Sequence, residues 1–168
     1  DVLWNKEFKE TSSSFGTAIV WPRGVVSEGS PVGYLMPQHY ARYVVQESVD
    51  LHLEGFYKYA DKSVLEKMAN TVSAFVIRDS RTPLFARDIG GAKTRAGLQP
   101  AGREWGDMDY NRFAGSSWAL LLPWDDGSEG RISEASEVTY DLTSLEFQGK
   151  TSTLVFIPTG MFLKESIR

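Results

Sequence analysis

The feature that most constrains this chain is an alternation of apolar and polar residues between Tyr43 and Glu54. Apolar residues occupy every second position over most of this stretch, and the residues between them include Asp50 and His52. Because successive side chains of a strand point to opposite faces of a sheet, the pattern predicts a long half-buried β-strand. A slip of one residue would bury ionisable side chains, so we expect the register of this strand to be well specified.

Most of the remaining chain also shows the chemistry of strands. Short segments rich in β-branched or aromatic residues predict further strands at 2–10, 16–21, 71–79, 84–89, 116–124, 132–142 and 151–158. The segment 116–124 is almost wholly apolar, which is typical of a strand buried on both faces. Turn residues at 79–82, followed by Pro83, predict a hairpin between two of these strands.

One segment carries the signals of a helix. Asp61 stands at the position of an N-cap, and Ser63 and Glu66 have the spacing of a capping box. Apolar residues then recur at helical spacing. These signals predict a short helix around residues 62–70.

Strands that do not alternate with helices argue against a parallel arrangement of strands joined by helices. The sequence therefore predicts an all-β, mainly antiparallel fold, namely a two-sheet β-sandwich similar to a jelly roll, with a closed barrel as the alternative. We expect a single domain over residues 1–168, because a chain of this length can bury roughly 70% of its unfolded surface.

Composition narrows the functions that the chain can have. The absence of cysteine excludes disulfides, thiolate catalysis and zinc–thiolate sites. The formal net charge of −4 argues against a nucleic-acid partner, since such binders are usually basic. No apolar run approaches the ~20 residues that a membrane-spanning helix needs, so we expect no membrane span. Because the chain begins at Asp1 rather than Met, we expect a preceding segment such as a signal peptide, a basic arm or a tag.

Aromatic residues at the ends of expected strands and in loops are the strongest functional signal. The chain has five Trp, seven Tyr and nine Phe, and such rings in loops can stack on sugars or anchor a protein partner. The residues expected to form a ligand-binding surface are Trp21, Tyr34, Trp105, Tyr110 and Trp124. The competing interpretation is that these rings cover the core.

An acidic stretch suggests calcium as a cofactor. Asp107, Asp109 and Asn111 have the spacing that opens a calcium-binding loop, and their oxygen atoms are suitable ligands. An EF-hand is excluded, because the positions that it requires to be Gly and Glu are Arg112 and Trp118. A looser calcium site is one interpretation of this stretch, and a polar turn without a metal is the other.

The polar face of the expected long strand offers a second candidate site. Asp50, His52 and Glu54 would share that face, and their side chains are of the types that bind divalent ions. Neighbouring side chains on one face of a strand are about 6.6–7 Å apart, so three of them diverge too far to hold one ion without a further ligand. A solvated face is therefore the simpler interpretation.

These observations leave three classes of function. The first is a non-catalytic structural or assembly subunit that acts through protein–protein contacts, as in a coat, shell or filament, and forms a homo-oligomer. The second is a carbohydrate-binding β-sandwich module that uses the loop aromatics. The third is a metal-assisted hydrolase, built on the Asp50, His52 and Glu54 face or on carboxylates near Asp107. We expect the first class, with the long loops at 23–37 and 90–106 contributing to contacts between chains.

Overall fold

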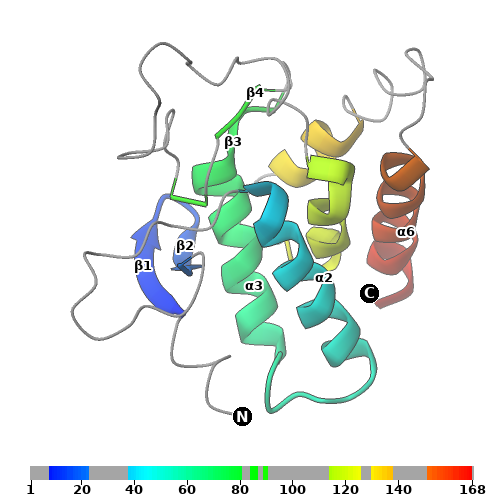
Figure 1. Cartoon of the computed structure of the whole chain (residues 1–168), viewed down its shortest axis with the longest axis horizontal. Helices are drawn as coiled ribbons and strands as arrows, with labels where there is room; N and C mark the ends of the chain where they lie inside the picture. The colour runs from blue at the N-terminus through cyan, green and yellow to red at the C-terminus, as the bar shows by residue number, and fades with distance from the viewer. Residues whose placement is uncertain are drawn as a thin grey trace.

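The computed structural model describes residues 8–22, 38–80, 84–86, 89–90, 114–125, 130–137 and 151–167. Within these ranges the chain is mainly helical, and strands occur only as two short antiparallel pairs. Figure 1 shows the helices packed beside one another, with the first strand pair at one side and the last helix at the other. The expected all-β sandwich with a jelly-roll-like arrangement is therefore wrong.

The described chain begins with a β-hairpin. Strands β1 (Lys9–Ser13) and β2 (Gly16–Val20) pair antiparallel, with Ser13 opposite Gly16 at the turn. Gly16 has a φ of 107°, a conformation that glycine adopts at little cost because it lacks a Cβ. The strand expected over 16–21 is confirmed over Gly16–Val20.

Helix α2 (Gln38–Leu53) occupies the stretch in which the long strand was expected. Its buried residues are Ala41, Val45, Ser48 and Val49, which recur at intervals of three and four as on one face of a helix. The prediction of a β-strand in this stretch is therefore wrong, and its buried face differs from the one that the alternation indicated.

A glycine-based Schellman motif ends α2. The Phe56 amide donates to the Leu51 carbonyl at 2.8 Å, and the Gly55 amide donates to the His52 carbonyl at 3.0 Å. Gly55 has a φ of 83°, in the left-handed region that this motif requires. The two bonds satisfy carbonyl groups that a helix end leaves open, and the chain turns here toward the next helix.

Helix α3 (Lys62–Thr71) begins where the sequence predicted it. Asp61 is its N-cap, and the Asp61 Oδ1 atom accepts a hydrogen bond from the Val64 amide at 2.9 Å. The short helix expected around 62–70 is confirmed.

The segment that follows α3 is only partly a strand. Helix η1 (Val72–Val76) continues α3 as one π-helical stretch, and strand β3 (Ile77–Asp79) then pairs antiparallel with β4 (Leu84–Phe85). The antiparallel pairing of β3 with β4 agrees with the hairpin expected here, although residues 81–83 of its turn lie outside the described residues. The strand expected over 71–79 is confirmed only at 77–79, and its first part is helical.

Side chains of α3 attach the first hairpin, and one of them, Lys67, forms an ion pair with Glu10 of β1. Asn70 Nδ2 donates to the Thr17 carbonyl at 2.9 Å. The Thr71 hydroxyl accepts from the Ile19 amide at 3.0 Å and lies 2.5 Å from the Ile19 carbonyl oxygen. These backbone groups belong to β2 and would otherwise form an open sheet edge, so α3 satisfies them and fixes the hairpin against the helices.

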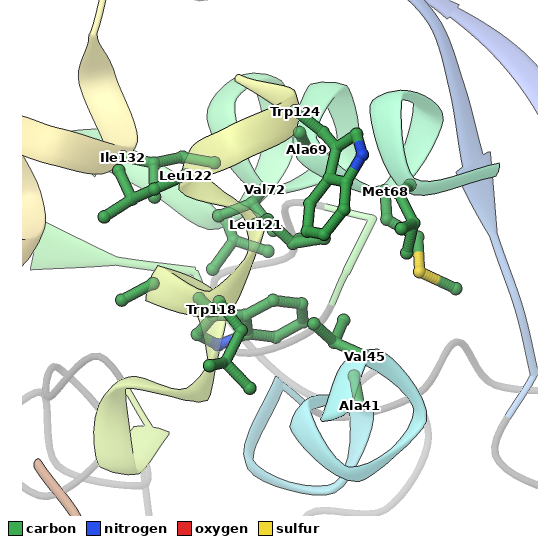
Figure 2. Close-up of a cluster of buried hydrophobic side chains, with 14 of the residues drawn as sticks. Ala41, Val45, Met68, Ala69, Val72, Trp118, Leu121, Leu122, Trp124 and Ile132 are labelled. Carbon is green, nitrogen blue, oxygen red and sulfur yellow. The ribbon is translucent and has the colours of Figure 1, made fainter. Parts of the chain in front are cut away.

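The centre of the molecule is η2 (Ala114–Trp124), a 3₁₀ helix. Residues 117–122 of this helix are all buried, and η2 contacts α2, α3 and the last helix. Figure 2 shows the Trp118 ring directed toward Val45 of α2, beside Leu121 of η2 itself. The burial expected for this segment is confirmed over 117–122, but the expected strand conformation is wrong.

Two further helical segments complete the described chain. Residues 131–137 are helical, and Ile132, Ala135 and Ser136 are buried. Helix α6 (Thr151–Ile167) packs on η2, as Figure 1 shows. The strand expected over 151–158 is therefore wrong, as is the described part of the strand expected over 132–142.

The contact between α6 and η2 is very close at Gly160. A Cβ atom added to this residue would lie 2.1 Å from the Ala119 carbonyl oxygen, which is far inside van der Waals contact. Only glycine allows the two helix backbones to approach this closely.

Candidate interaction surface

Of the five aromatic residues expected to bind a ligand, Trp21 and Trp124 lie in the described chain. Each is 3% exposed and belongs to the buried core. The Trp21 ring packs edge to face on Phe8, with ring centroids 5.5 Å apart. These two rings therefore cover the core, which is the competing interpretation that the sequence offered. The expected site residues that lie outside the described residues are Tyr34, Trp105, Tyr110, Asp107, Asp109 and Asn111, together with most of the loops at 23–37 and 90–106.

Large apolar side chains are exposed instead on α2 and on the turn after it. Tyr43 is 54% exposed, Leu53 50%, Phe56 55% and Tyr57 59%. Single exposed apolar residues are normal, but here four large ones lie within fifteen residues of chain. The sequence interpretation missed Tyr43 and Leu53 because the strand pattern placed both on the buried face.

The outer face of α2 combines these apolar side chains with acidic ones. Its exposed residues are Tyr40, Tyr43, Glu47, Asp50 and Leu53, and the exposed Glu54 follows directly after the helix. Glu47, Asp50 and Glu54 recur at intervals of three and four, so their carboxylates lie in one line along the helix. We call these three residues the acidic stripe. None of them forms a hydrogen bond or an ion pair through its side chain in the described structure.

The charges of the acidic stripe oppose one another. Partial burial raises the pKa of Asp50 above its ordinary value of 3.8, and the negative charge of Glu54 raises this pKa further. Like charges four residues apart on a helix destabilise it. A cation placed beside these two carboxylates would relieve the repulsion.

Tyr57 is held in place by His52. The two rings meet edge to face with centroids 5.0 Å apart, and His52 also packs on Trp124 at 5.3 Å. The His52 Nδ1 atom lies 2.8 Å from the Ala60 carbonyl oxygen. Because a carbonyl oxygen can only accept, Nδ1 carries the hydrogen of this bond. The ring of His52 is therefore fixed between the end of α2, the following turn and η2.

Tyr43 is held in a similar way by Arg42. The Arg42 Nη2 atom donates to the Tyr43 hydroxyl at 2.8 Å, and the guanidinium carbon lies 4.6 Å from the ring centroid. Tyr43 and Tyr57, two of the exposed tyrosines, are thus each ordered by a neighbouring side chain. An aromatic ring that is ordered in advance loses less conformational entropy when it enters an interface.

The helical conformation of α2 separates the three ionisable residues that a strand would have aligned. Asp50 and Glu54 lie one turn apart on the outer face, whereas His52 contacts Trp124 of η2. In the ranges that the structure describes, no group of three or more His, Asp or Glu residues is placed to hold a metal ion. The candidate metal site at Asp50, His52 and Glu54 required a β-strand, whereas this segment is helical up to Leu53.

A second polar group lies beside η1, and its bonds serve the fold. Ser73 Oγ donates to Asp125 Oδ1 at 3.3 Å, and the Ile132 amide donates to Asp125 Oδ2 at the same distance. The Ser80 hydroxyl donates to Glu134. These bonds occupy both carboxylates and position the helical residues 131–137 against η1 and η2, so we assign this group a structural role.

Comparison of the chain with protein-family models, curated proteins and solved structures found no match. Among the helices that the structure describes, none is both long enough and apolar enough to cross a membrane. The outer face of α2 and the turn after it, with their ordered tyrosines and unpaired carboxylates, are therefore the basis on which we infer a function.

Proposed function

We propose that the protein is an interaction domain that binds another protein through α2 and the turn that follows it. The observation that supports this proposal is the group of exposed large side chains, Tyr43, Leu53, Phe56 and Tyr57. Two of them are ordered by neighbouring side chains. Exposed aromatic anchors of this kind supply most of the binding energy in many protein interfaces.

A different chain suits this surface better than a second copy of the same chain. In a symmetric dimer both copies use the same surface, so one interface would contain two acidic stripes. Repulsion between like charges across an interface disfavours such a pairing. The homo-oligomer expected from the sequence stays a prediction for other faces, and light scattering on a size-exclusion column tests it.

Random peptides displayed on phage and selected on the immobilised protein test the proposal. Selected peptides are expected to bind Phe56→Ser and Tyr57→Ser at least about tenfold more weakly than wild type, because the loss of a central aromatic anchor reduces affinity by this order. Phe162→Ser is the matched control, because Phe162 is 68% exposed but lies on α6. This control is expected to bind the peptides as wild type does.

Two outcomes would contradict the proposal. One is that all selected peptides bind the wild type and the Phe56 and Tyr57 variants equally. The other is that a glycan array, rather than the peptide library, gives ligands that depend on Phe56 and Tyr57, which would favour the carbohydrate-binding class instead. Thermal unfolding followed by circular dichroism establishes that each variant is folded, and small changes are expected because the replaced rings are mostly exposed.

A further inference from the structure

We infer that the partner presents a positively charged segment, rich in Lys or Arg, to the acidic stripe formed by Glu47, Asp50 and Glu54. The inference rests on the proposed function, because it names the chemistry of the partner for the same surface. Its basis is charge complementarity, together with the apolar residues that border the stripe.

The acidic stripe is a line of charge rather than a single point. Glu47 and Glu54 are seven residues apart, which corresponds to about 10 Å along a helix axis. Tyr43 precedes Glu47 by four residues and so lies one turn further along the same face. Leu53 follows Asp50 by three residues and borders the stripe near its other end. A partner with cations spaced over two helical turns, flanked by apolar residues, would match this pattern.

The cationic side chains near the stripe in the sequence are directed to other groups. Arg42 packs on Tyr43, and the Lys58 Nζ atom lies 5.4 Å from the centroid of the Tyr59 ring. Lys62 forms an ion pair with Glu66, with Nζ and Oε1 3.5 Å apart. Among the residues that the structure describes, none forms an ion pair with the stripe.

The electrostatics of Asp50 favour a cation at this place. Burial and the nearby Glu54 both raise the pKa of Asp50, which means that its ionised form is stabilised less than in water. A Lys or Arg side chain beside these carboxylates stabilises the ionised form. Charged groups at the edge of an interface mainly set the partner that is chosen and the rate of association, while the aromatic residues provide anchoring contacts.

The experiment uses peptides that were selected on the wild type and depend on Phe56 and Tyr57. Their affinity is measured by fluorescence anisotropy for wild type and for two triple variants. The stripe variant is Glu47→Gln, Asp50→Asn and Glu54→Gln. The control variant is Glu66→Gln, Glu137→Gln and Glu165→Gln, all at positions outside α2. Each variant removes three formal negative charges, so the two differ in the position of the change and not in net charge.

We expect the selected peptides to be enriched in Lys and Arg. The stripe variant is expected to bind them at least about tenfold more weakly, and the control variant within about twofold of wild type, because exposed charges act mainly on near neighbours. The affinity of the wild type is expected to fall about tenfold between about 0.05 and 0.5 M salt, which shortens the screening length.

The failure of the inference can be told from the failure of the proposed function. Peptides that depend on Phe56 and Tyr57 but lack Lys and Arg, or that bind the stripe variant as tightly as wild type, would overturn the inference and leave the proposed function in place. Equal losses in the stripe and control variants would also overturn it, because the attraction would then follow net charge. Peptides that do not depend on Phe56 and Tyr57 contradict the proposed function itself.

Discussion

At the scale of single residues, the absence of a side chain at Gly160 sets the distance between α6 and η2. A Cβ atom at this position would lie 2.1 Å from the Ala119 carbonyl oxygen and 2.5 Å from its carbonyl carbon. Backbone atoms cannot rotate away as a flexible side chain can, so one of the two helices must shift. The tolerance of the core to change is therefore lower at this contact than at the exposed positions of α6.

We expect Gly160→Ala to reduce the free energy of unfolding by ~1–3 kcal/mol, as overpacked cores do. Denaturant unfolding followed by circular dichroism measures the change. Glu165→Ala is the control on the same helix, and because this side chain is exposed its effect should stay within ~0.5 kcal/mol. An unchanged midpoint for Gly160→Ala would show that α6 and η2 do not meet in this way.

Single residues also show what can be predicted from the sequence. The Asp61 cap and the apolar spacing after it located α3, because a capping side chain acts within one turn and leaves a local signal. The Thr71 hydroxyl, in contrast, bonds to Ile19, which is 52 residues away in the chain. A bond of this kind leaves no local pattern, so the attachment of the hairpin to α3 could not be predicted.

At the scale of elements, α2 shows why a periodic pattern can mislead. Its helical face is lined by Ala41, Val45, Ser48 and Val49, and two of these four are small residues that do not count as strongly apolar. The β-branched and aromatic residues of the stretch favour a strand in isolation, but packing against η2 and α3 decides the outcome. For the same reason the strand pattern places Tyr43 and Leu53, which we propose for binding, on the buried side.

Segments η2 and α6 were misassigned for a related reason. A short continuous apolar run fits a buried strand and a buried helix equally well, since neither has a polar face. In α6, Pro158 stood at the end of the expected strand, yet the helix continues through it. Burial could therefore be predicted for η2, whereas the conformation of these segments could not.

The turn after α2 gives a prediction at the same scale. Gly55 has a φ of 83°, and a Cβ at this residue would meet no atom within 4 Å, so any cost of a substitution is conformational. We expect Gly55→Ala to lower the free energy of unfolding by ~1–2 kcal/mol, because an L-residue is strained in the left-handed region. Gly55→Asn should cost less, since Asn tolerates this region better, and denaturant unfolding distinguishes the two. Equal stability of the alanine variant and wild type would show that the Schellman turn does not form.

At the scale of the whole molecule, Asp50 links folding to pH. The folded protein binds a proton at Asp50 more tightly than the unfolded chain does, because its pKa is raised above 3.8 by burial and by Glu54. At a pH above the raised pKa, the ionised Asp50 lowers the free energy of unfolding. This loss of stability disappears as the pH falls through the raised pKa toward 3.8, because the carboxyl group becomes protonated.

We expect Asp50→Asn to unfold at a slightly higher temperature than wild type at neutral pH, because the variant has no charge that is partly buried and repelled by Glu54. The difference should vanish below pH 3.8, where the wild-type carboxyl is protonated in both states. Thermal unfolding over a series of pH values measures the effect, and Glu165→Gln is a control at an exposed site on α6. A gain that grows as the pH falls would contradict the assigned direction of the shift.

The central position of η2 also has a consequence for the order in which the chain is made. Helices α2 and α3 precede η2 in the sequence, but α6, which covers another side of η2, is synthesised last among the described elements. A ribosome adds about 5–20 residues per second, so the apolar surface of η2 is uncovered for seconds after its own synthesis. We therefore expect a nascent chain released before residue 151 to bind chaperones that recognise apolar segments.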